Sequence, residues 1–299
     1  MQSKIEIKVA GLMVNYCSIL QSYNLCKNLI DSGVVDLMVI LDNSPFDTKK
    51  YDIDFGEKIK VLEGDNKGGY SYGNNIALRY LQQSYNLKTV LIMNPDVIIE
   101  KETFIECLKL FENQNEFKVL VPEMLDYYRK KDINYWDKVT YGKCLCECSY
   151  LLNFKKRSNV KHFSPSNIDN VYTADVLRGT FMICDFDALC DIDFFDDTTF
   201  LYWEEDKLFA RLNQKGYKSG VILNKYFIHD HDIKSKKNIN LKKKNKTQTL
   251  YWNSMYSYCR DYLNINILKK IILKAFIIYG YIEKNIIWTL IKIKQLIKK

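Results

Sequence analysis

Thr89-Val90-Leu91-Ile92-Met93-Asn94-Pro95-Asp96-Val97 is the stretch that decides the fold of this chain. Its continuous apolar run, rich in Val and Ile, is typical of a strand that is buried on both faces. Proline lacks a backbone donor, so the strand should end near Asn94. Asp96 would then lie at the carboxyl end of a central parallel strand, where ligands of open α/β sheets collect. A carboxylate there suits a divalent cation that holds phosphates, and an Asx-type turn is the alternative interpretation.

Short strands and helices alternate before this stretch. Strands are expected at residues 5–14, 34–41 and 59–62, and helices at 18–32 and 72–83. This order predicts an α/β fold with a Rossmann-like, mostly parallel sheet flanked by helices. Polar residues follow three of the strands, namely Asn15, Asp42 and Asp96. Because parallel strands end at one edge of a sheet, these residues should converge where a nucleotide could lie.

A loop rich in glycine and asparagine, residues 64–75, links the strand at 59–62 to the following helix. The loop matches neither the Gly-x-Gly-x-x-Gly fingerprint nor the P-loop with its Lys-Ser/Thr pair. A dinucleotide-dependent dehydrogenase and a P-loop NTPase are therefore disfavoured.

The second half of the chain is less regular. We expect an exposed helix at 103–112, an irregular excursion or hairpin within 123–170, a helix at 207–214, and strands at 117–122, 171–177, 179–183 and 218–223. Cys144, Cys146 and Cys148 alternate, as in a strand, and no second Cys/His pair completes a zinc site. Glu204, Glu205 and Asp206 open the helix at 207–214, where acids also complement the helix dipole.

Charge is concentrated near the C-terminus. The 299 residues carry a net charge of +8, with seven lysines within 234–246 and eight lysines against Glu283 within 265–299. The rest of the chain is mildly acidic, which disfavours nucleic acid as a partner and favours an anionic membrane surface. We expect a lysine-rich loop at 236–246 and a helical extension at 247–299. Its basic helix, 267–297, either lies on a membrane or packs on the domain or a second subunit.

The location follows from the cysteines and the N-terminus. Nine cysteines and the absence of an apolar leader at the N-terminus predict reduced thiols and a cytoplasmic protein. Peripheral contact with the inner face of the cell membrane is compatible with that location. Lys274 interrupts the apolar segment 271–282, so no transmembrane helix is expected.

Several motifs, taken in order, resemble those of family 2 glycosyltransferases with the GT-A fold. They are Asp42-Asn43-Ser44, Asn66-Lys67-Gly68 with Asn74-Asn75, Asn94-Pro95-Asp96-Val97, Gly179-Thr180-Phe181-Met182, the segment from Phe200 to Asp206 with Leu208 and Arg211, Gly216-Tyr217, and His229. The resemblance covers about residues 5–235, which gives a catalytic domain at 1–235. The most similar subgroup contains bacterial rhamnosyl- and galactofuranosyl-type transferases of surface polysaccharides such as capsule or O-antigen.

The resemblance implies a nucleotide-sugar donor, either a UDP- or a dTDP-sugar, with Mg²⁺ or Mn²⁺ on its diphosphate. It assigns the metal to Asp96 together with His229 or His231. Asn94 stands where the family's Asp-x-Asp motif has its first acid, so Asp96 would make most of the protein's contact with the metal. The nucleotide sugar itself would contact seven further residues: Asn15, Asp42, Asn66, Gly68, Asn75, Asn94 and Gly179.

The acid cluster resembles the family's Glu-Asp pair, whose second acid is the general base of an inverting transfer to a glycan or lipid-linked glycan acceptor. Counting back from Leu208 favours Glu205 as this base, a literal reading of Glu-Asp favours Asp206, and Glu204 precedes both.

Two other functions compete with glycosyl transfer. A sugar nucleotidyltransferase would be expected to carry Arg or Lys within residues 11–16, which this chain lacks. A non-catalytic sugar- or membrane-binding scaffold would not need the acids.

Overall fold

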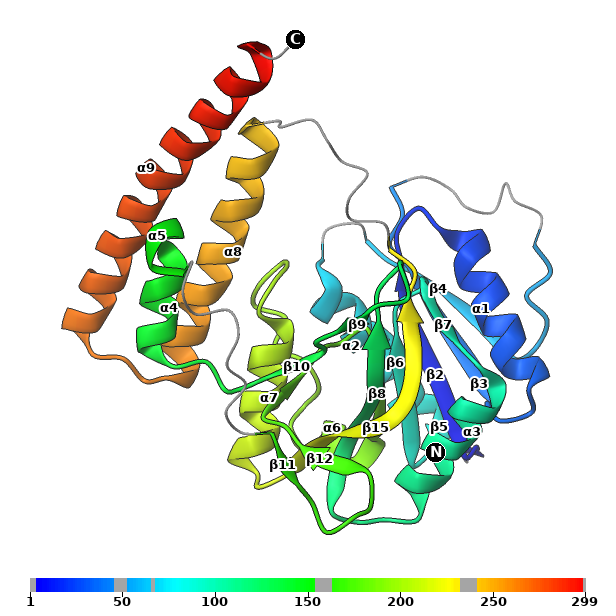
Figure 1. Ribbon diagram of the computed structural model, residues 1–299. Coiled ribbons are helices and arrows are strands. Elements are labelled where there is room, and N and C mark those ends of the chain that lie inside the picture. The colour runs from blue at the N-terminus through cyan, green and yellow to red at the C-terminus, as the bar shows by residue number, and fades with distance from the viewer. Residues whose placement is uncertain (1–3, 46–52, 66–67, 154–162, 232–240, 298–299) are drawn as a thin grey trace.

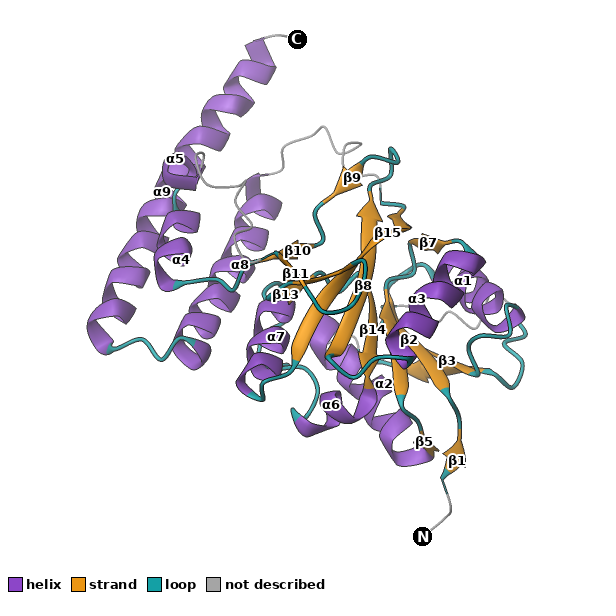
Figure 2. Ribbon diagram, turned by 60° about the horizontal axis from the view of Figure 1, so that its bottom comes forward, coloured by secondary structure: helices purple, strands orange, loops and turns teal. Residues whose placement is uncertain are grey.

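The computed structural model describes residues 4–45, 53–65, 68–153, 163–231 and 241–297. An α/β body holds the central sheet, and a helical extension stands beside it (Figure 1). The second view shows helices on both faces of the sheet (Figure 2). This is the α/β architecture expected from the sequence.

One large sheet organises the body. Its strands, from edge to edge, are β11 (Ser164–Pro165), β12 (Val171–Thr173), β15 (Lys218–His229), β8 (Phe117–Leu125), β14 (Phe181–Asp185), β6 (Thr89–Met93), β2 (Val9–Asn15), β3 (Leu37–Asp42) and β4 (Ile59–Glu63). Strands β6, β2, β3 and β4 are parallel neighbours, whereas β14 runs antiparallel between β6 and β8. All five residues of β6 are buried, which confirms the strand predicted from the opening stretch.

Shorter strands complete the body. They are β7 (Val97–Ile99) on β15, β9 (Lys131–Asp132) on β8, and the pairs β1 (Ile5–Glu6) with β5 (Tyr85–Asn86) and β10 (Tyr135–Trp136) with β13 (Val176–Leu177).

Helices bury apolar stripes on each face of the sheet. The helices α2 (Tyr70–Ser84), α6 (Phe186–Asp191) and α7 (Glu204–Gln214) pack on one face, and α1 (Ile19–Asp31) and α3 (Lys101–Glu112) pack on the other. In α3, Phe104, Cys107, Leu108 and Phe111 recur at helical spacing and are buried. The helix expected at 103–112 is therefore confirmed, but it is amphipathic rather than exposed.

The irregular or hairpin structure expected around the three cysteines is wrong. Residues there form α4 (Tyr141–Cys148), followed by α5 (Tyr150–Asn153). Thr140 caps α4 by accepting a hydrogen bond from the backbone of Lys143. Cys144 and Cys148 lie one helical turn apart and are buried, while Cys146 is half-buried. The alternation was misleading because positions i and i+4 face the same side of a helix.

The C-terminal extension is built from α8 (Leu241–Tyr262) and α9 (Ile267–Ile297), which pack with α4. Together with α4 and part of α7 they form a separate hydrophobic core, which includes Trp252, Met255, Cys259 and Leu273. The loop predicted at 236–246 is wrong for 241–246, which start α8, and residues 236–240 lie outside the described residues. Lysine is a good helix former, so a lysine run does not prevent a helix. None of the helices that the structure describes is both long and apolar enough to cross a membrane.

Candidate active site

Of the three polar residues predicted to converge at the carboxyl edge of the sheet, Asn15 and Asp42 are in contact. Asn15 is the last residue of β2, and Asp42 is the last residue of β3. The Nδ2 of Asn15 donates a hydrogen bond of 2.8 Å to Asp42 Oδ1. Ser44 donates to the same oxygen through its hydroxyl and its backbone N–H. Asn15 is fully buried, and its side-chain oxygen accepts hydrogen bonds from Ser18, just before α1, and from Ser22, within α1. The edge therefore presents a rigidly held carboxylate.

The glycine-rich loop lies beside this edge. Asn43 donates through Nδ2 to the carbonyl oxygen of Gly68 at 3.0 Å. A side chain at Gly68 would collide with the ring of Tyr72, with its Cβ at 1.8 Å, so only glycine fits this backbone position. Gly68 thus lies near the predicted nucleotide edge, whereas Asn66 lies outside the described residues.

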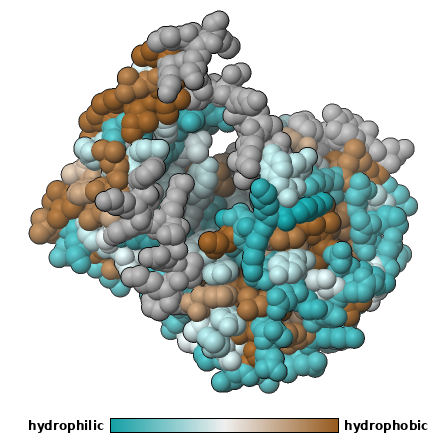
Figure 3. Space-filling model, viewed as in Figure 1, coloured by the Kyte–Doolittle hydropathy of each residue, from teal (hydrophilic) through white to brown (hydrophobic). Residues whose placement is uncertain are grey.

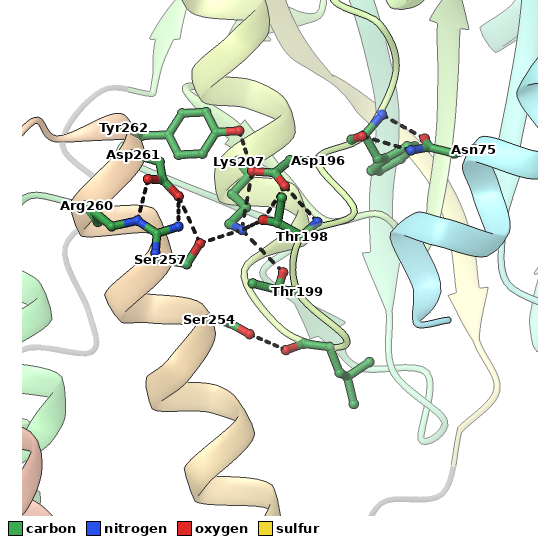
Figure 4. Close-up of polar contacts among 12 residues, drawn as sticks. Asn75, Asp196, Thr198, Thr199, Lys207, Ser254, Ser257, Arg260, Asp261 and Tyr262 are labelled. Carbon is green, nitrogen blue, oxygen red and sulfur yellow. Dashed lines mark hydrogen bonds and ion pairs between the residues drawn. The ribbon is translucent and has the colours of Figure 1, made fainter. Parts of the chain in front are cut away.

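Asn75 has a different role from nucleotide binding. Its amide exchanges two hydrogen bonds of 2.9 Å with the backbone of Phe195 and also reaches Asp197 at 3.2 Å. Asn75 is buried, so these partners occupy its amide inside the protein. It anchors the loop at 195–203 that leads into the acid cluster, and Figure 4 shows this contact.

The three acids begin α7 after a strained turn. Tyr202 and Trp203 both have positive φ, 72° and 68°, a conformation that bulky residues rarely adopt. Such strain persists only where the surroundings enforce it, and it is concentrated at functional sites. The turn directs the acid cluster towards the body, with the carboxylates at the N-terminus of the helix, where the dipole favours negative charge.

Two of the acids are buried. Burial, followed by the charge of Glu205, raises the pKa of Glu204 to about 7. Burial also raises the pKa of Asp206 to about 7, although the hydrogen bond that it accepts from Trp136 Nε1 at 3.0 Å works in the opposite direction. Each buried carboxyl therefore binds its proton more tightly than an exposed acid.

Glu205 is the most accessible member of the cluster. Its Oε1 accepts a hydrogen bond from the backbone N–H of Gly179 at 3.1 Å. The carbonyl oxygen of Gly179 in turn accepts a hydrogen bond from the hydroxyl of Tyr70 at 2.9 Å. Gly179, which the resemblance assigned to the nucleotide sugar, thus lies directly beside the acid cluster.

A cavity of about 570 Å³ joins these elements. Its lining includes Asn94 from the opening stretch, Gly179, and all three acids. The structure therefore brings together three parts of the chain that sequence analysis assigned to one site.

Helix α4 and the helical extension packed on it supply one wall of this cavity, and the sequence did not predict this. Lys143 and Glu147 of α4 and Tyr251 of α8 line it, together with Trp136. Tyr251 donates a hydrogen bond to the carboxylate of Glu147 across the two helices. The signal that could have revealed this is the run of tyrosines at 251–262, since aromatic side chains commonly line sugar- and ligand-binding sites.

A buried lysine in the first turn of α7 holds the loop before the acids. Lys207 is fully buried, and its Nζ lies 3.3 Å from Asp196 Oδ2 and 3.1 Å from the hydroxyls of Thr198 and Ser257. Ser257 belongs to α8, so the ammonium joins the loop, α7 and the extension (Figure 4). Burial tends to raise the pKa of Asp196, but the hydrogen bonds from Thr198 and Tyr262 and the charge of Lys207 lower it to about 2.

Asp96 and the two histidines form a separate cluster. Asp96 Oδ1 lies 3.4 Å from His229 Nε2, and Oδ2 lies 3.3 Å from His231 Nδ1. Burial alone would raise the pKa of Asp96, yet its contact with His229 and the charge of that imidazole hold it below its usual value. Asp96 lines a second cavity of about 480 Å³, between α1 and β7, and is not among the residues that line the cavity holding the acids.

The donor set of this cluster fits a divalent cation in part. Asp96 Oδ1 is buried and makes no hydrogen bond of normal geometry among the described residues, which is typical of an oxygen available to a ligand. Carboxylate oxygen is the ligand that Mg²⁺ and Mn²⁺ prefer, and imidazole is a usable additional one. No group of three or more His, Cys, Asp or Glu in the described ranges is arranged to hold a metal. Further ligands would have to come from a bound diphosphate and water.

The chain is similar in sequence to two known glycosyltransferases. The chain is 24% identical over 209 residues to the low-salt glycan biosynthesis hexosyltransferase Agl10 of Haloferax volcanii, covering 70% of this chain and 62% of that protein. It is 24% identical over 172 residues to the rhamnosyltransferase WbbL of Escherichia coli, covering 56% of this chain and 63% of that protein. The matches thus span a little less than two thirds of each relative. No protein-family model matches the chain.

Solved structures share the fold. GalNAc-T7 with UDP, GalNAc and Mn²⁺ superposes with a TM-score of 0.55 at 10% identity, covering 91% of this chain and 55% of that one. The mannosyltransferase PcManGT from Pyrobaculum calidifontis, with GDP-Man and Mn²⁺, superposes with a TM-score of 0.53 at 12% identity, covering 90% and 68%. The chain therefore has the fold of the GT-A glycosyltransferases and is similar to members of that group in sequence, as its motifs predicted.

Proposed function

We propose that the protein is an inverting glycosyltransferase that moves a hexosyl or rhamnosyl group from a UDP- or dTDP-sugar to a hydroxyl group of an acceptor. The cavity at the start of α7 carries this proposal, because one accessible carboxylate, Glu205, shares it with Asn94 and Gly179. The UDP and GalNAc in the GalNAc-T7 structure and the GDP-Man in the PcManGT structure support a nucleotide sugar as the class of donor.

Glu205 is the general base in this proposal. Its neighbours Glu204 and Asp206 are buried, and they accept hydrogen bonds from the backbone N–H of Tyr202 and from Trp136, so they are less available to an acceptor hydroxyl. Glu205 would take the proton from the acceptor hydroxyl while that oxygen attacks the anomeric carbon. The bond between the anomeric carbon and the diphosphate breaks on the opposite face, so the configuration at that carbon inverts.

The other predicted residues would hold the donor. Asp42, held by Asn15, would accept hydrogen bonds from the base or ribose, and Gly68 would allow close backbone approach. Asp96 with His229, or with His231, would hold Mg²⁺ or Mn²⁺. Such an ion would neutralise charge on the leaving diphosphate.

The acceptor belongs to the same proposal. We infer a glycan or a lipid-linked glycan of a surface polysaccharide, such as capsule or O-antigen, extended at the cytoplasmic face of the membrane. The relatives named for glycan biosynthesis and rhamnosyl transfer support this class of acceptor. The aromatic wall formed by Trp136, Tyr202 and Tyr251 suits the apolar face of a sugar ring.

A donor panel tests the proposal. The full chain is incubated with UDP-, dTDP- and GDP-sugars and either Mg²⁺ or Mn²⁺, and release of nucleoside diphosphate is measured. Glu205→Gln should lower kcat by roughly 10²–10⁴-fold with the accepted donor and leave KM for the donor nearly unchanged. Asp206→Asn should cost less, because its carboxyl is committed to Trp136.

The matched control is Glu102→Gln. Glu102 is another acid in the first turn of a helix, α3, on the body of the protein and outside the cavity. Its replacement should leave kcat unchanged. Full activity of Glu205→Gln, or release from none of the donors with either metal, would contradict the proposed function.

A further inference from the structure

The last helix has apolar residues on two opposite faces. Its inner face packs on the extension through Leu273 and Gly280, which are buried, and through Phe276 and Ile277. Gly280 touches α4 so closely that a Cβ there would lie 1.8 Å from the carbonyl oxygen of Cys148. This close contact fixes which side of α9 faces outward.

The outward side is also apolar. Six of its residues recur at intervals of three, four or seven, with exposed fractions of 47–63%: Ile271, Ile278, Ile282, Ile286, Leu290 and Ile293. Figure 3 shows this hydrophobic surface along α9. A helix that is apolar all round is normally buried, and a large exposed apolar strip normally marks a contact with a partner or a membrane.

The short helix α5 enlarges this surface. Leu151 is 68% exposed and Leu152 is 48% exposed. Glu283, the one acid of α9, accepts hydrogen bonds from the hydroxyl of Ser149 at 3.1 Å and the backbone N–H of Tyr150 at 2.7 Å. The carboxylate thus holds the start of α5 against α9, and its negative charge is used within the protein.

The charges around the strip are positive. Helix α9 contains six lysines against Glu283 alone, and Lys269 and Lys274 are exposed. The lysine-rich start of α8 lies beside the end of α9, because Lys244 Nζ sits 5.4 Å from the ring of Trp288. An apolar strip bordered by lysines matches the interface of an anionic bilayer.

We propose that the outward face of α9, with Leu151 and Leu152 of α5, docks in the plane of an anionic phospholipid bilayer. A helix of 31 residues would lie along the surface for about 46 Å. A second copy of the chain is a poorer occupant, since a two-fold interface would bring the exposed lysines of two copies, such as Lys269 and Lys274, together. This docking does not depend on sugar transfer, so the two proposals can fail separately.

Vesicle flotation of the full chain tests the docking. The vesicles contain phosphatidylcholine either alone or with roughly 30% phosphatidylglycerol, which gives them the negative surface potential that attracts lysines. The wild type should float with the anionic vesicles, at least about tenfold more than with the neutral ones, and high salt should weaken the binding. The triple variant Ile278→Gln, Ile282→Gln, Ile286→Gln should lose at least about tenfold in partitioning, because it removes apolar contact only.

The matched control replaces three exposed apolar residues of the body, Ile5→Gln, Leu20→Gln and Ile133→Gln. It should float like the wild type. Size-exclusion chromatography with light scattering, without vesicles, examines the second-copy alternative. Equal flotation of wild type and the α9 variant, no flotation of the wild type, or a dimer that the α9 variant dissociates would each overturn the inference. Donor turnover without vesicles should be unchanged in both triple variants.

Discussion

Replacing Lys207 by methionine should destabilise the protein strongly. Methionine nearly keeps the length of the side chain but removes the charge and its donors, while Asp196, only 10% exposed, loses its cation. Breaking a buried ion pair in this way costs about 3–5 kcal/mol, because an uncompensated charge remains inside. The free energy of unfolding, measured by urea denaturation, should fall by about that amount.

The double variant Lys207→Met, Asp196→Asn tests the cause. If the buried charge is responsible, neutralising Asp196 should recover part of the loss, so the double variant should be more stable than Lys207→Met alone. The amide oxygen introduced by Asp196→Asn could still accept the hydrogen bond that the backbone N–H of Thr198 donates to the native carboxylate.

Lys215→Met is the control at the other end of the same helix. Lys215 caps α7 and pairs with Asp191 at 3.0 Å, but both side chains are more than 40% exposed. Solvent already screens that pair, so only a small change is expected. If Lys207→Met were no more destabilising than Lys215→Met, the Lys207 network would not stabilise the loop before the acids, and the reasoning would be refuted.

Two further predictions concern the acid cluster and the extension. Asp206 has a folded pKa of about 7, above its unfolded value, so its contribution to stability is full below about pH 4 and is lost as the pH rises towards 7. Asp206→Asn should therefore flatten the fall of the unfolding free energy between about pH 4 and 7, measured in urea at each pH; an unchanged slope would count against burial of this carboxyl. Gly280→Ala should lower the free energy of unfolding by about 1–3 kcal/mol, because the added methyl group would overpack α9 on α4. The control Gly142→Ala should cause no such loss, since its Cβ would meet no atom within 4 Å. Equal melting temperatures of the two variants would contradict the close packing at Gly280.

The parallel half of the fold could be predicted from sequence because its signals are local. Each of β2, β3 and β6 is a buried apolar run that ends at a polar residue, and neighbouring strands of this kind need no distant partner to be recognised. The convergence of Asn15 and Asp42 followed from that topology alone.

The rest of the site depends on contacts that are distant in sequence. Helix α4 is stabilised by packing on α8 and α9, far along the chain, so its cysteine pattern alone was ambiguous. Lys207 lies in a run of charged residues that is typical of a solvated helix start, but it is buried in the structure, where one of its partners is Ser257, 50 residues further along the chain. Asn75 matched a nucleotide-binding motif, yet its amide is occupied by Phe195.

The extension therefore links two surfaces that the sequence presents as unrelated. Tyr251 of α8 lines the cavity that contains the acids. Ser257 of the same helix contacts the ammonium group of Lys207, which follows the acids in α7. Helix α9 packs on α8 with one face and presents its isoleucine face outward. Because these helices share one core, a bilayer bound by α9 would lie at a fixed position relative to the cavity. If both proposals hold, a lipid-linked acceptor would reach Glu205 from a defined direction, and the extension would position the acceptor as well as attach the protein.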